Sequence, residues 1–176
     1  MTLALHTFGP TVPYRGVDVQ SFDMMTKPRD EVERVWRDQG AKLWRSLTAY
    51  TGDRELASDA MAEAFAQALG RGDALESTDR WIWRAAFRIA AGELQRRTRA
   101  TLEREPTTQM PEPVADLVRA LKVLSPNQRS AVILCLYADL PGRDVARIMR
   151  CSQATVRVHL SQARRRLRPL LEDTDA

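Results

Sequence analysis

The sequence predicts an all-α protein made of two helical domains joined by a flexible linker. From Asp30 onward, apolar residues recur at spacings of three and four, which is the period of helices packed along one face. We predict no strand in any segment, since the apolar residues follow the helical period over the longer windows. The stretch TRATLEREPTTQMPEP interrupts the helical period with three prolines, so residues 100–113 are predicted to form the linker.

Composition restricts the class of protein before any motif is considered. The 176 residues, 44% of them hydrophobic, suffice for one or two small domains with packed cores. The start, MTLALHTFGP, has no basic residue ahead of its short apolar run, and no segment approaches the length of a membrane span. We therefore expect a cytoplasmic protein.

The residues that usually bind metals or carry catalysis are few and scattered. Cys135 and Cys151 lack CxxC spacing, and they are expected to be reduced and structural. A metal site built from Cys151 and His159 would need further ligands, which the sequence does not supply. With two histidines and no glycine loop that cradles phosphate, the chain lacks a catalytic constellation. We expect a protein that uses no cofactor and acts by binding rather than as an enzyme.

The first domain is predicted to span residues 29–99, after a flexible arm at residues 1–28 that contains several glycines and prolines. Helices are expected over residues 30–52, 55–69 and 79–99, each with one apolar face. The residues expected to face the core are Val32, Val35, Trp36, Leu43, Trp44, Leu47 and Tyr50 in the first helix, Met61, Ala64, Phe65, Ala68 and Leu69 in the second, and Ile82, Ala85, Ala86, Ile89, Ala90 and Leu94 in the third.

The second domain is predicted to span residues 114–172 and to begin with a helix from Val114 to Leu124. The next four residues, Ser-Pro-Asn-Gln at 125–128, supply an N-cap, a proline at the first helical position and a capping-box partner. This second helix is expected to continue through Tyr137. A two-turn helix at 143–149, a turn at Arg150-Cys151 and a cap at Ser152 then precede a last long helix.

The last helix combines an apolar stripe with a dense basic surface. The stripe consists of Val156, Leu160, Ala163 and Leu167, at spacings of four, three and four. Eight arginines against the single Asp144 lie between residues 143 and 168, so the helix lacks acids to neutralise them. A helical wheel built on the stripe directs four residues outward and three to the flanks. The outward residues are Ala154, Val158, Ser161 and Arg165, and the flanking ones are Arg157, Gln162 and Arg168.

A short helix, a tight turn, a cap and a basic helix form the helix-turn-helix arrangement, whose second helix enters the DNA major groove. The outward residue types suit that groove, since arginine forks onto guanine, glutamine pairs with adenine and valine meets a thymine methyl. The alternative is a helical hairpin with a solvated arginine face. We favour DNA binding because cap, turn and charge occur together.

The run LSPNQRSAVILCLYADLPGRDVARIMRCSQATVRVHLSQARRRL resembles the C-terminal promoter-recognition domain, region 4, of bacterial sigma-70-family factors. ELASDAMAEAFAQAL resembles the region 2 helix that docks on core RNA polymerase, and RWIWRAAFRIAAGELQRR resembles the helix that opens the promoter. Two domains with only a short linker are similar to the extracytoplasmic-function (ECF) subgroup.

The resemblance implies a transcription initiation factor and assigns three sets of residues. The last helix would contact the −35 element through Ala154, Thr155, Arg157, Val158, His159, Ser161, Gln162 and Arg165. The third helix would hold the −10 element through Trp83, Arg84, Arg88, Arg96 and Arg97, with Trp81 expected to be the buried tryptophan of the pair. The second helix would meet the β′ clamp coiled coil through Asp59, Ala62, Glu63 and Phe65, although Phe65 is expected chiefly to be buried. The β flap and an anti-sigma factor are further partners that the family implies.

The sequence departs from the family pattern at several positions. Ala62 replaces a common glutamine and Gly92 a common acid, which predicts weaker contacts there. Arg150 stands at a turn position where glycine is usual, and a left-handed arginine would cost on the order of 1 kcal/mol. Val158 and His159 replace the usual small polar and basic pair, which predicts an altered promoter sequence.

Two rival functions remain open at this point. TVRVHL also resembles the recognition helix of LuxR-type regulators, but such proteins usually carry a sensor or receiver domain with strands, and none is predicted here. A sigma-like decoy that binds an anti-sigma factor without supporting transcription is the second rival, and the departures at Ala62 and Gly92 keep it open.

Overall fold

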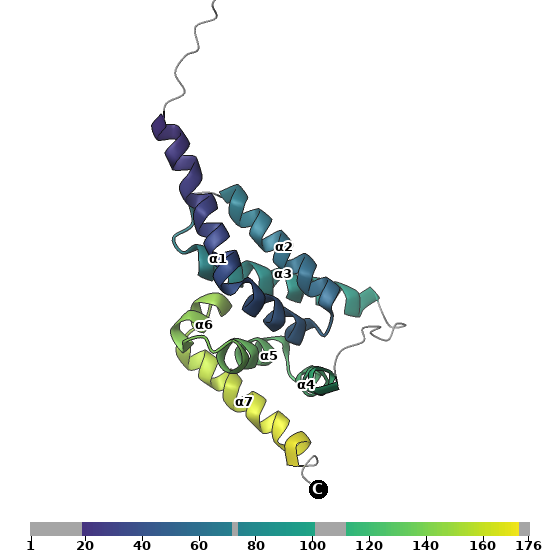
Figure 1. The fold of residues 1–176 in the computed structure, drawn as a ribbon. Helices are drawn as coiled ribbons and strands as arrows, with labels where there is room; N and C mark the ends of the chain where they lie inside the picture. Colours follow the sequence, from purple (N-terminus) through teal and green to yellow (C-terminus); the bar gives the residue numbers. More distant parts are fainter. Residues whose placement is uncertain (1–18, 72–73, 101–111, 173–176) are drawn as a thin grey trace, which may run out of the picture.

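The computed structural model describes residues 19–71, 74–100 and 112–172, and these are helical with no strand among them (Figure 1). The helices in chain order are α1 (Val19–Thr51), α2 (Arg54–Arg71), α3 (Thr78–Ala100), α4 (Glu112–Lys122), α5 (Pro126–Val132), a π-helical turn η2 (Ile133–Tyr137), α6 (Gly142–Met149) and α7 (Gln153–Glu172). The all-α prediction is therefore confirmed.

Helices α1, α2 and α3 pack together as a first unit (Figure 1). Their core is made of apolar residues that recur at helical spacing, such as Leu43 and Leu47 of α1, Leu56 of α2 and Ile82 of α3, all of them at most 1% exposed. Small side chains line α2 on its buried face, which allows the three helices to approach closely. The predicted apolar faces of this unit are confirmed in outline.

The N-terminal boundary of the first unit differs from the prediction. Residues 19–28, expected within a flexible arm, are the first turns of α1, and Pro28 lies inside this helix. Glycine and proline density was the reason for predicting an arm, but the glycines of this segment all precede residue 19. Residues 1–18 and most of the predicted linker, 101–111, lie outside the described residues.

Two residues expected in the core are exposed instead. Trp36 of α1 is 53% exposed and Leu69 of α2 is 49% exposed. Trp36 packs edge-on against Phe65, with ring centroids 4.9 Å apart, at the margin where α1 meets α2. A helical wheel shows which face is apolar but not where the neighbouring helix ends, so residues at the edge of the stripe are misassigned.

The second unit, α4 to α7, starts its helices at the predicted caps. The Ser125 side chain accepts a hydrogen bond from the Gln128 amide, and the Gln128 side chain accepts one from the Ser125 amide. This is the reciprocal capping box that the sequence predicts. Ser152 likewise accepts a hydrogen bond from the Thr155 amide at 3.0 Å, which confirms the cap of α7.

The helix expected to run to Tyr137 is regular only as far as Val132. The backbone then widens into η2, where the Ala138 amide donates to the carbonyl of Ile133 at 2.8 Å, five residues back. The wider turn rotates the following side chains away from the core, so Leu136 is 70% exposed and Tyr137 46%. The sequence predicts a helix that continues regularly to this point, and periodicity cannot reveal such a local change of helical pitch.

The two units pack directly against one another. Arg129 of α5 donates from Nη1 to the carbonyl of Tyr50 at 3.1 Å, and its guanidinium lies over the Tyr50 ring. Arg80 of α3 and Asp144 of α6 form an ion pair of 3.8 Å. The buried apolar residues of both units consequently form one continuous cluster.

Candidate nucleic-acid and protein interfaces

Helix α7 presents its predicted outward residues to solvent. Val156 and Ala163 of its apolar stripe are buried, whereas Ala154, Val158 and Arg165 are exposed on the opposite side. Val158 is 51% exposed, and Arg157 beside it is exposed as well. The helical wheel therefore orients α7 correctly, as the stripe is fixed on α5 and α6, its packing partners.

The turn into α7 has the backbone conformation that the helix-turn-helix pattern predicts. Arg150 caps α6 with φ 55° and ψ 44°, in the left-handed region. Glycine is the residue favoured there, so this arginine is strained by about 1–2 kcal/mol. The amide of Cys151 donates to the carbonyl of Ala146 at 2.9 Å and closes the turn.

Some candidate residues of α7 also have internal partners. The Gln162 side chain accepts from Gln128 Nε2 at 3.0 Å, which links α7 to the start of α5. The Thr155 hydroxyl lies 2.9 Å from that of Ser152. His159 is half-buried, and its Nδ1 has no hydrogen-bond partner among the described residues. Gln162 is thus held by the fold, while Arg157, Ser161 and Arg165 are exposed.

Helix α3 corrects the prediction about its two tryptophans. Trp83, not Trp81, is the buried one: it is 2% exposed, and its Nε1 donates to Gln39 Oε1 at 2.7 Å. Trp81 is only partly buried, and the guanidinium of Arg71 stacks on it at 4.9 Å. Residues two apart on a helix point about 200° apart, so one faces the core and the other does not. Trp83 cannot stack on a base in this arrangement.

The four candidate arginines of α3 fall into two groups. Arg97 forms an ion pair of 2.6 Å with Asp53, whose side chain also caps α2, and Arg96 pairs with Glu93. These two arginines are therefore engaged by the protein itself. Arg84 and Arg88 form no ion pair with any residue in the described ranges. Of these four arginines, Arg84 and Arg88 are the two that can contact phosphates without first breaking an ion pair.

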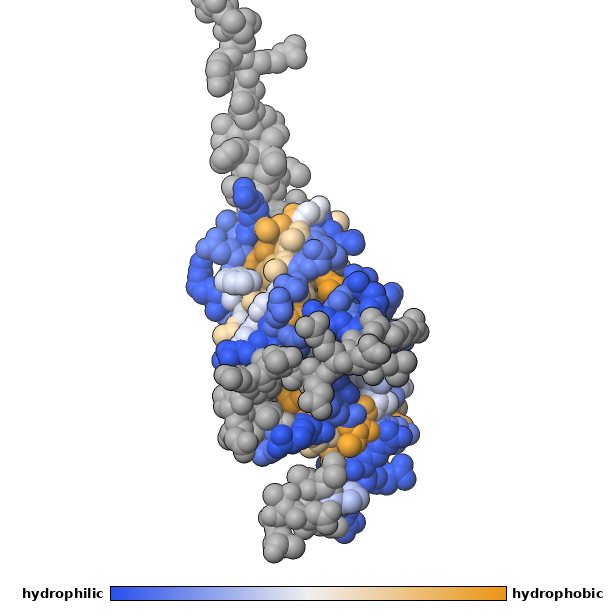
Figure 2. All heavy atoms as spheres, turned by 90° about the vertical axis from the view of Figure 1, so that its right-hand side faces the viewer, coloured by the Kyte–Doolittle hydropathy of each residue, from blue (hydrophilic) through white to orange (hydrophobic). Residues whose placement is uncertain are grey.

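Helix α2 presents a ridge of candidate protein-binding residues between two grooves. Asp59, Ala62 and Glu63 are exposed along it, whereas Phe65 is buried, as expected. One groove, of about 510 Å³, is lined by all three exposed residues. The other, of about 670 Å³, is lined by Ala62 together with Trp36. Figure 2 shows apolar residues gathered between hydrophilic ones on one face of the molecule.

Trp36 is a surface residue that the sequence analysis missed. Its indole lies beside the α2 ridge, where a docking helix would meet both the carboxylates and an aromatic side chain. Large exposed aromatic side chains are enriched at protein interfaces. Trp36 lies at the side margin of the contact between α1 and α2, so no signal in the sequence separates it from the core positions.

Neither cysteine belongs to a metal centre in the described part of the chain. Cys135 and Cys151 are free thiols, and burial raises the pKa of both. Within residues 19–71, 74–100 and 112–172, no three His, Cys, Asp or Glu residues gather as metal ligands. The helices of these ranges include none long and apolar enough to cross a membrane.

The protein consists of a three-helix unit and a second unit that contains a basic helix-turn-helix. This arrangement is typical of a protein that binds nucleic acid. A family model for sigma-70, region 4, matches residues 115–167. The RNA polymerase sigma-E factor of Streptomyces coelicolor is 30% identical over 83% of this chain and 90% of its own length. That of Streptomyces antibioticus is 32% identical over 82% and 87%. The chain belongs to the sigma-70 family of RNA polymerase sigma factors, in its ECF subgroup, and directs RNA polymerase to promoters.

Two solved structures share the fold of this chain. CnrH, solved in complex with the cytosolic domain of CnrY, matches with a TM-score of 0.68 and 17% identity over 90% of this chain and 97% of that one. The sigma factor RpoE of Bartonella quintana, solved with the anti-sigma factor NepR, matches with a TM-score of 0.60 and 20% identity over 85% and 97%. Family membership favours a sigma factor over the rival LuxR-type regulator.

Proposed function

We propose that the two units divide promoter recognition between them. Residues 114–172 bind the −35 element through α7, residues 29–99 hold the −10 element through α3, and the α2 ridge binds core RNA polymerase. The protein acts by binding, without catalysis, in the cytoplasm. The observation that carries this proposal is the set of exposed groove-compatible residues on α7, directly after a capped turn.

For the −35 element, Arg165 and Val158 are the residues we expect to contact bases. Both are exposed on the side of α7 opposite its buried stripe. Arginine forks onto the O6 and N7 of guanine, and the valine methyls suit the methyl of thymine. Arg157 and Arg168 lie on the flanks, where we expect them to contact phosphates and to make binding fall steeply with salt.

For the −10 element, the burial pattern changes the residues that we propose. Trp81 replaces Trp83 as the stacking side chain, because Trp83 is buried and hydrogen-bonded to Gln39. Arg84 and Arg88 lack acidic partners in the described structure and are proposed to hold the separated strand. Arg96 and Arg97 would contribute only if their ion pairs broke.

For the polymerase, we propose that the clamp coiled coil of β′ lies along the α2 ridge. Asp59 and Glu63 would pair with basic residues of that helix, Ala62 would allow close approach, and Trp36 would supply apolar area beside them. The β flap is the expected partner of the second unit. The sigma factor RpoE of Bartonella quintana, which has a similar fold, was solved with an anti-sigma factor, and an anti-sigma factor is a further partner that we propose for this chain.

The test is run-off transcription with purified core polymerase, this protein and a pool of promoter fragments. Specific transcripts that disappear without the protein are expected, and Glu63→Lys should reduce them by weakening polymerase binding. Asp116→Lys, an exposed acid on α4, is the matched control and should leave them unchanged. Duplex binding without transcripts would favour a regulator, and neither binding nor transcripts would favour a decoy.

A further inference from the structure

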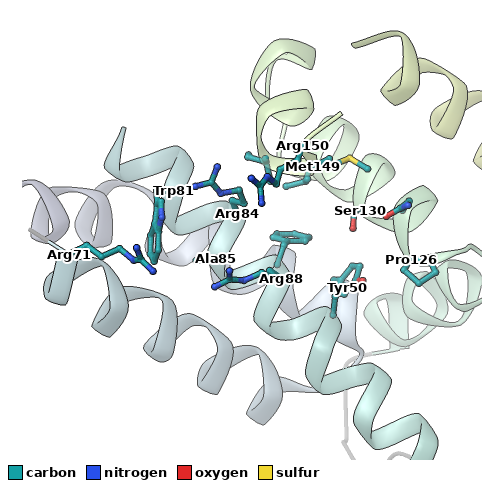
Figure 3. A pocket seen from close by; sticks show the side chains of 15 residues that line it. Tyr50, Arg71, Trp81, Arg84, Ala85, Arg88, Pro126, Ser130, Met149 and Arg150 are labelled. Atoms are coloured by element: carbon teal, nitrogen blue, oxygen red, sulfur yellow. The ribbon is translucent and has the colours of Figure 1, made fainter. Parts of the chain in front are cut away.

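A cleft of about 490 Å³ lies where the two units meet, and it is strongly basic (Figure 3). Arg84 and Arg88 of α3, Arg71 at the end of α2 and Arg150 at the turn after α6 all line it. Figure 3 shows Arg84 on α3 and Arg150 on the facing unit, with Arg71 against the face of Trp81. Side chains from both units therefore build this cleft.

The four arginines share this cleft with no acidic side chain of the described residues, although Glu76 lines an adjoining pocket with Arg71, Arg84 and Arg150. None of the four forms an ion pair within the described ranges, and the guanidinium of Arg71 stacks on the indole of Trp81. Arg97 of α3, by contrast, is paired with Asp53. Four like charges at one cleft repel each other unless an anion is bound among them.

The backbone at Arg150 adds an independent observation. This residue occupies the left-handed region, where glycine would avoid the strain. Residues held in such conformations cluster at functional and ligand-binding positions. Arg150 forms no ion pair within the described structure that would offset this strain. A stabilising role in the fold therefore does not explain why an arginine occupies this position. Its guanidinium does contribute to the basic cleft.

We propose that this cleft binds an oligophosphate group, either inorganic or carried by a nucleotide. Guanidinium groups bind phosphate oxygens through paired hydrogen bonds, and four of them suit a ligand with several negative charges. Asn127 and Ser130 add neutral polar side chains to the lining. The volume lies in the range of small-molecule sites, and the position between the units suits a compact anion rather than a duplex.

Such a ligand would link the two units, because its arginines come from both sides. It should therefore stabilise the packed arrangement by an amount that rises with the logarithm of the ligand concentration once that concentration exceeds Kd. If Arg84 and Arg88 hold promoter DNA as proposed above, the ligand would also compete with DNA. That consequence depends on the proposed function, whereas oligophosphate binding itself does not.

Isothermal titration calorimetry on the full-length protein, without DNA or polymerase, tests the proposal. Inorganic tripolyphosphate, ATP and AMP are titrated at physiological salt. We expect saturable binding of one tripolyphosphate or ATP per chain and at least about tenfold weaker binding of AMP, which carries one phosphate. Tighter binding of ATP than of tripolyphosphate would identify a nucleotide as the source, and equal binding would identify the phosphate chain alone.

The decisive variant is Arg150→Gly, which removes a charge and relieves the strained backbone. It should fold at least as stably as the parent protein yet bind tripolyphosphate about tenfold more weakly, because one guanidinium is lost. Arg150→Lys keeps the charge and should bind much more tightly than the glycine variant. Arg143→Gln removes a neighbouring arginine that does not line the cleft, and should change affinity less than twofold.

Two results would overturn the proposal. One is the absence of saturable binding of tripolyphosphate and ATP up to millimolar concentration. The other is equal weakening by Arg150→Gly and Arg143→Gln, which would show diffuse attraction to a basic surface rather than a site. Neither result bears on promoter-directed transcription, so the two proposals fail separately.

Discussion

The side chain of Arg129 joins the two units by contacting the Tyr50 residue in two ways. Its Nη1 donates to the Tyr50 carbonyl at 3.1 Å, and its guanidinium lies 5.6 Å from the centre of the Tyr50 ring. The same group donates from Nε to the carbonyl of Leu121 at 3.0 Å, at the end of α4. One arginine thus satisfies carbonyls at the ends of two helices that belong to different units.

Arg129→Ala is expected to destabilise the protein by about 2–3 kcal/mol, since hydrogen bonds from a charged donor are lost and partly buried carbonyls are left unsatisfied. The midpoint of urea denaturation measures the effect. Arg119→Ala is the control, because Arg119 forms only an exposed ion pair with Asp116. Equal losses in the two variants would contradict the role given to Arg129.

Tyr50 makes the stability of the protein sensitive to alkaline pH. Burial raises the pKa of its hydroxyl above the ordinary 10.0, against smaller lowering effects of Ser130 and Arg129. Because the pKa is higher in the folded state, the stability is fully present below about pH 10 and falls as the pH rises towards the folded pKa. Tyr50→Phe should show a shallower loss between pH 9 and 11, measured by urea denaturation. Parallel pH profiles for the two proteins would refute this.

Substituting the two tryptophans of α3 should have different effects, one on the stability of the protein and the other on promoter opening. Trp83→Ala removes a buried ring and is expected to cost about 3–5 kcal/mol of folding free energy. Trp81→Ala is expected to cost much less, because Trp81 is only partly buried, yet to reduce strand opening at promoters. Thermal denaturation measures the first effect, and a fluorescent base in the −10 element measures the second. Normal opening with Trp81→Ala would rule out base stacking by this residue.

Two glycines should respond to alanine in opposite directions. Gly52 ends α1 with φ 71°, and an added Cβ would lie 2.8 Å from Cγ1 of Val118. Gly52→Ala is therefore expected to lower the free energy of unfolding by at least about 1–2 kcal/mol, because the backbone is strained and α4 is displaced. Gly92 lies inside α3 with open space around it. Gly92→Ala should raise the free energy of unfolding by about 0.5–1 kcal/mol, because alanine favours the helix more than glycine does. Urea denaturation of both variants tests this, and a stabilised Gly52→Ala would be inconsistent with the packing of α4 on α1.

Arg165 should distinguish base recognition from phosphate binding. Arg165→Ala is expected to weaken binding to the promoter by about 1–3 kcal/mol and to relax the preference at one base pair, because a forked contact to guanine is lost. Fluorescence anisotropy with a set of single-substitution duplexes measures both effects. Arg34→Ala, on α1 and paired with Glu31, is the control with the same change of charge. A loss equal on all duplexes would make Arg165 a phosphate contact.

Local signals proved sufficient for the all-helical class, for the caps of α5 and α7 and for the orientation of α7, but not for the start of α1 or for the π-helical turn η2. The buried positions Val156 and Ala163 recur at helical spacing, and a stripe of that kind orients its helix wherever a core is available. The Ser125 cap depends only on residues within four positions of one another, so its prediction needed no knowledge of distant contacts. The exposed set around Val158 and Arg165 follows from that same stripe.

Contacts between distant segments decided the remainder. Whether Trp81 or Trp83 is buried depends on Gln39 of α1, and whether Arg97 is free depends on Asp53, each 44 residues away in the chain. The exposure of Trp36 depends on how α2 packs beside α1, and the basic cleft exists only because Arg150 is brought to face α3. Periodicity reports which face of a helix is apolar, but burial and charge pairing are properties of neighbours that only packing brings together.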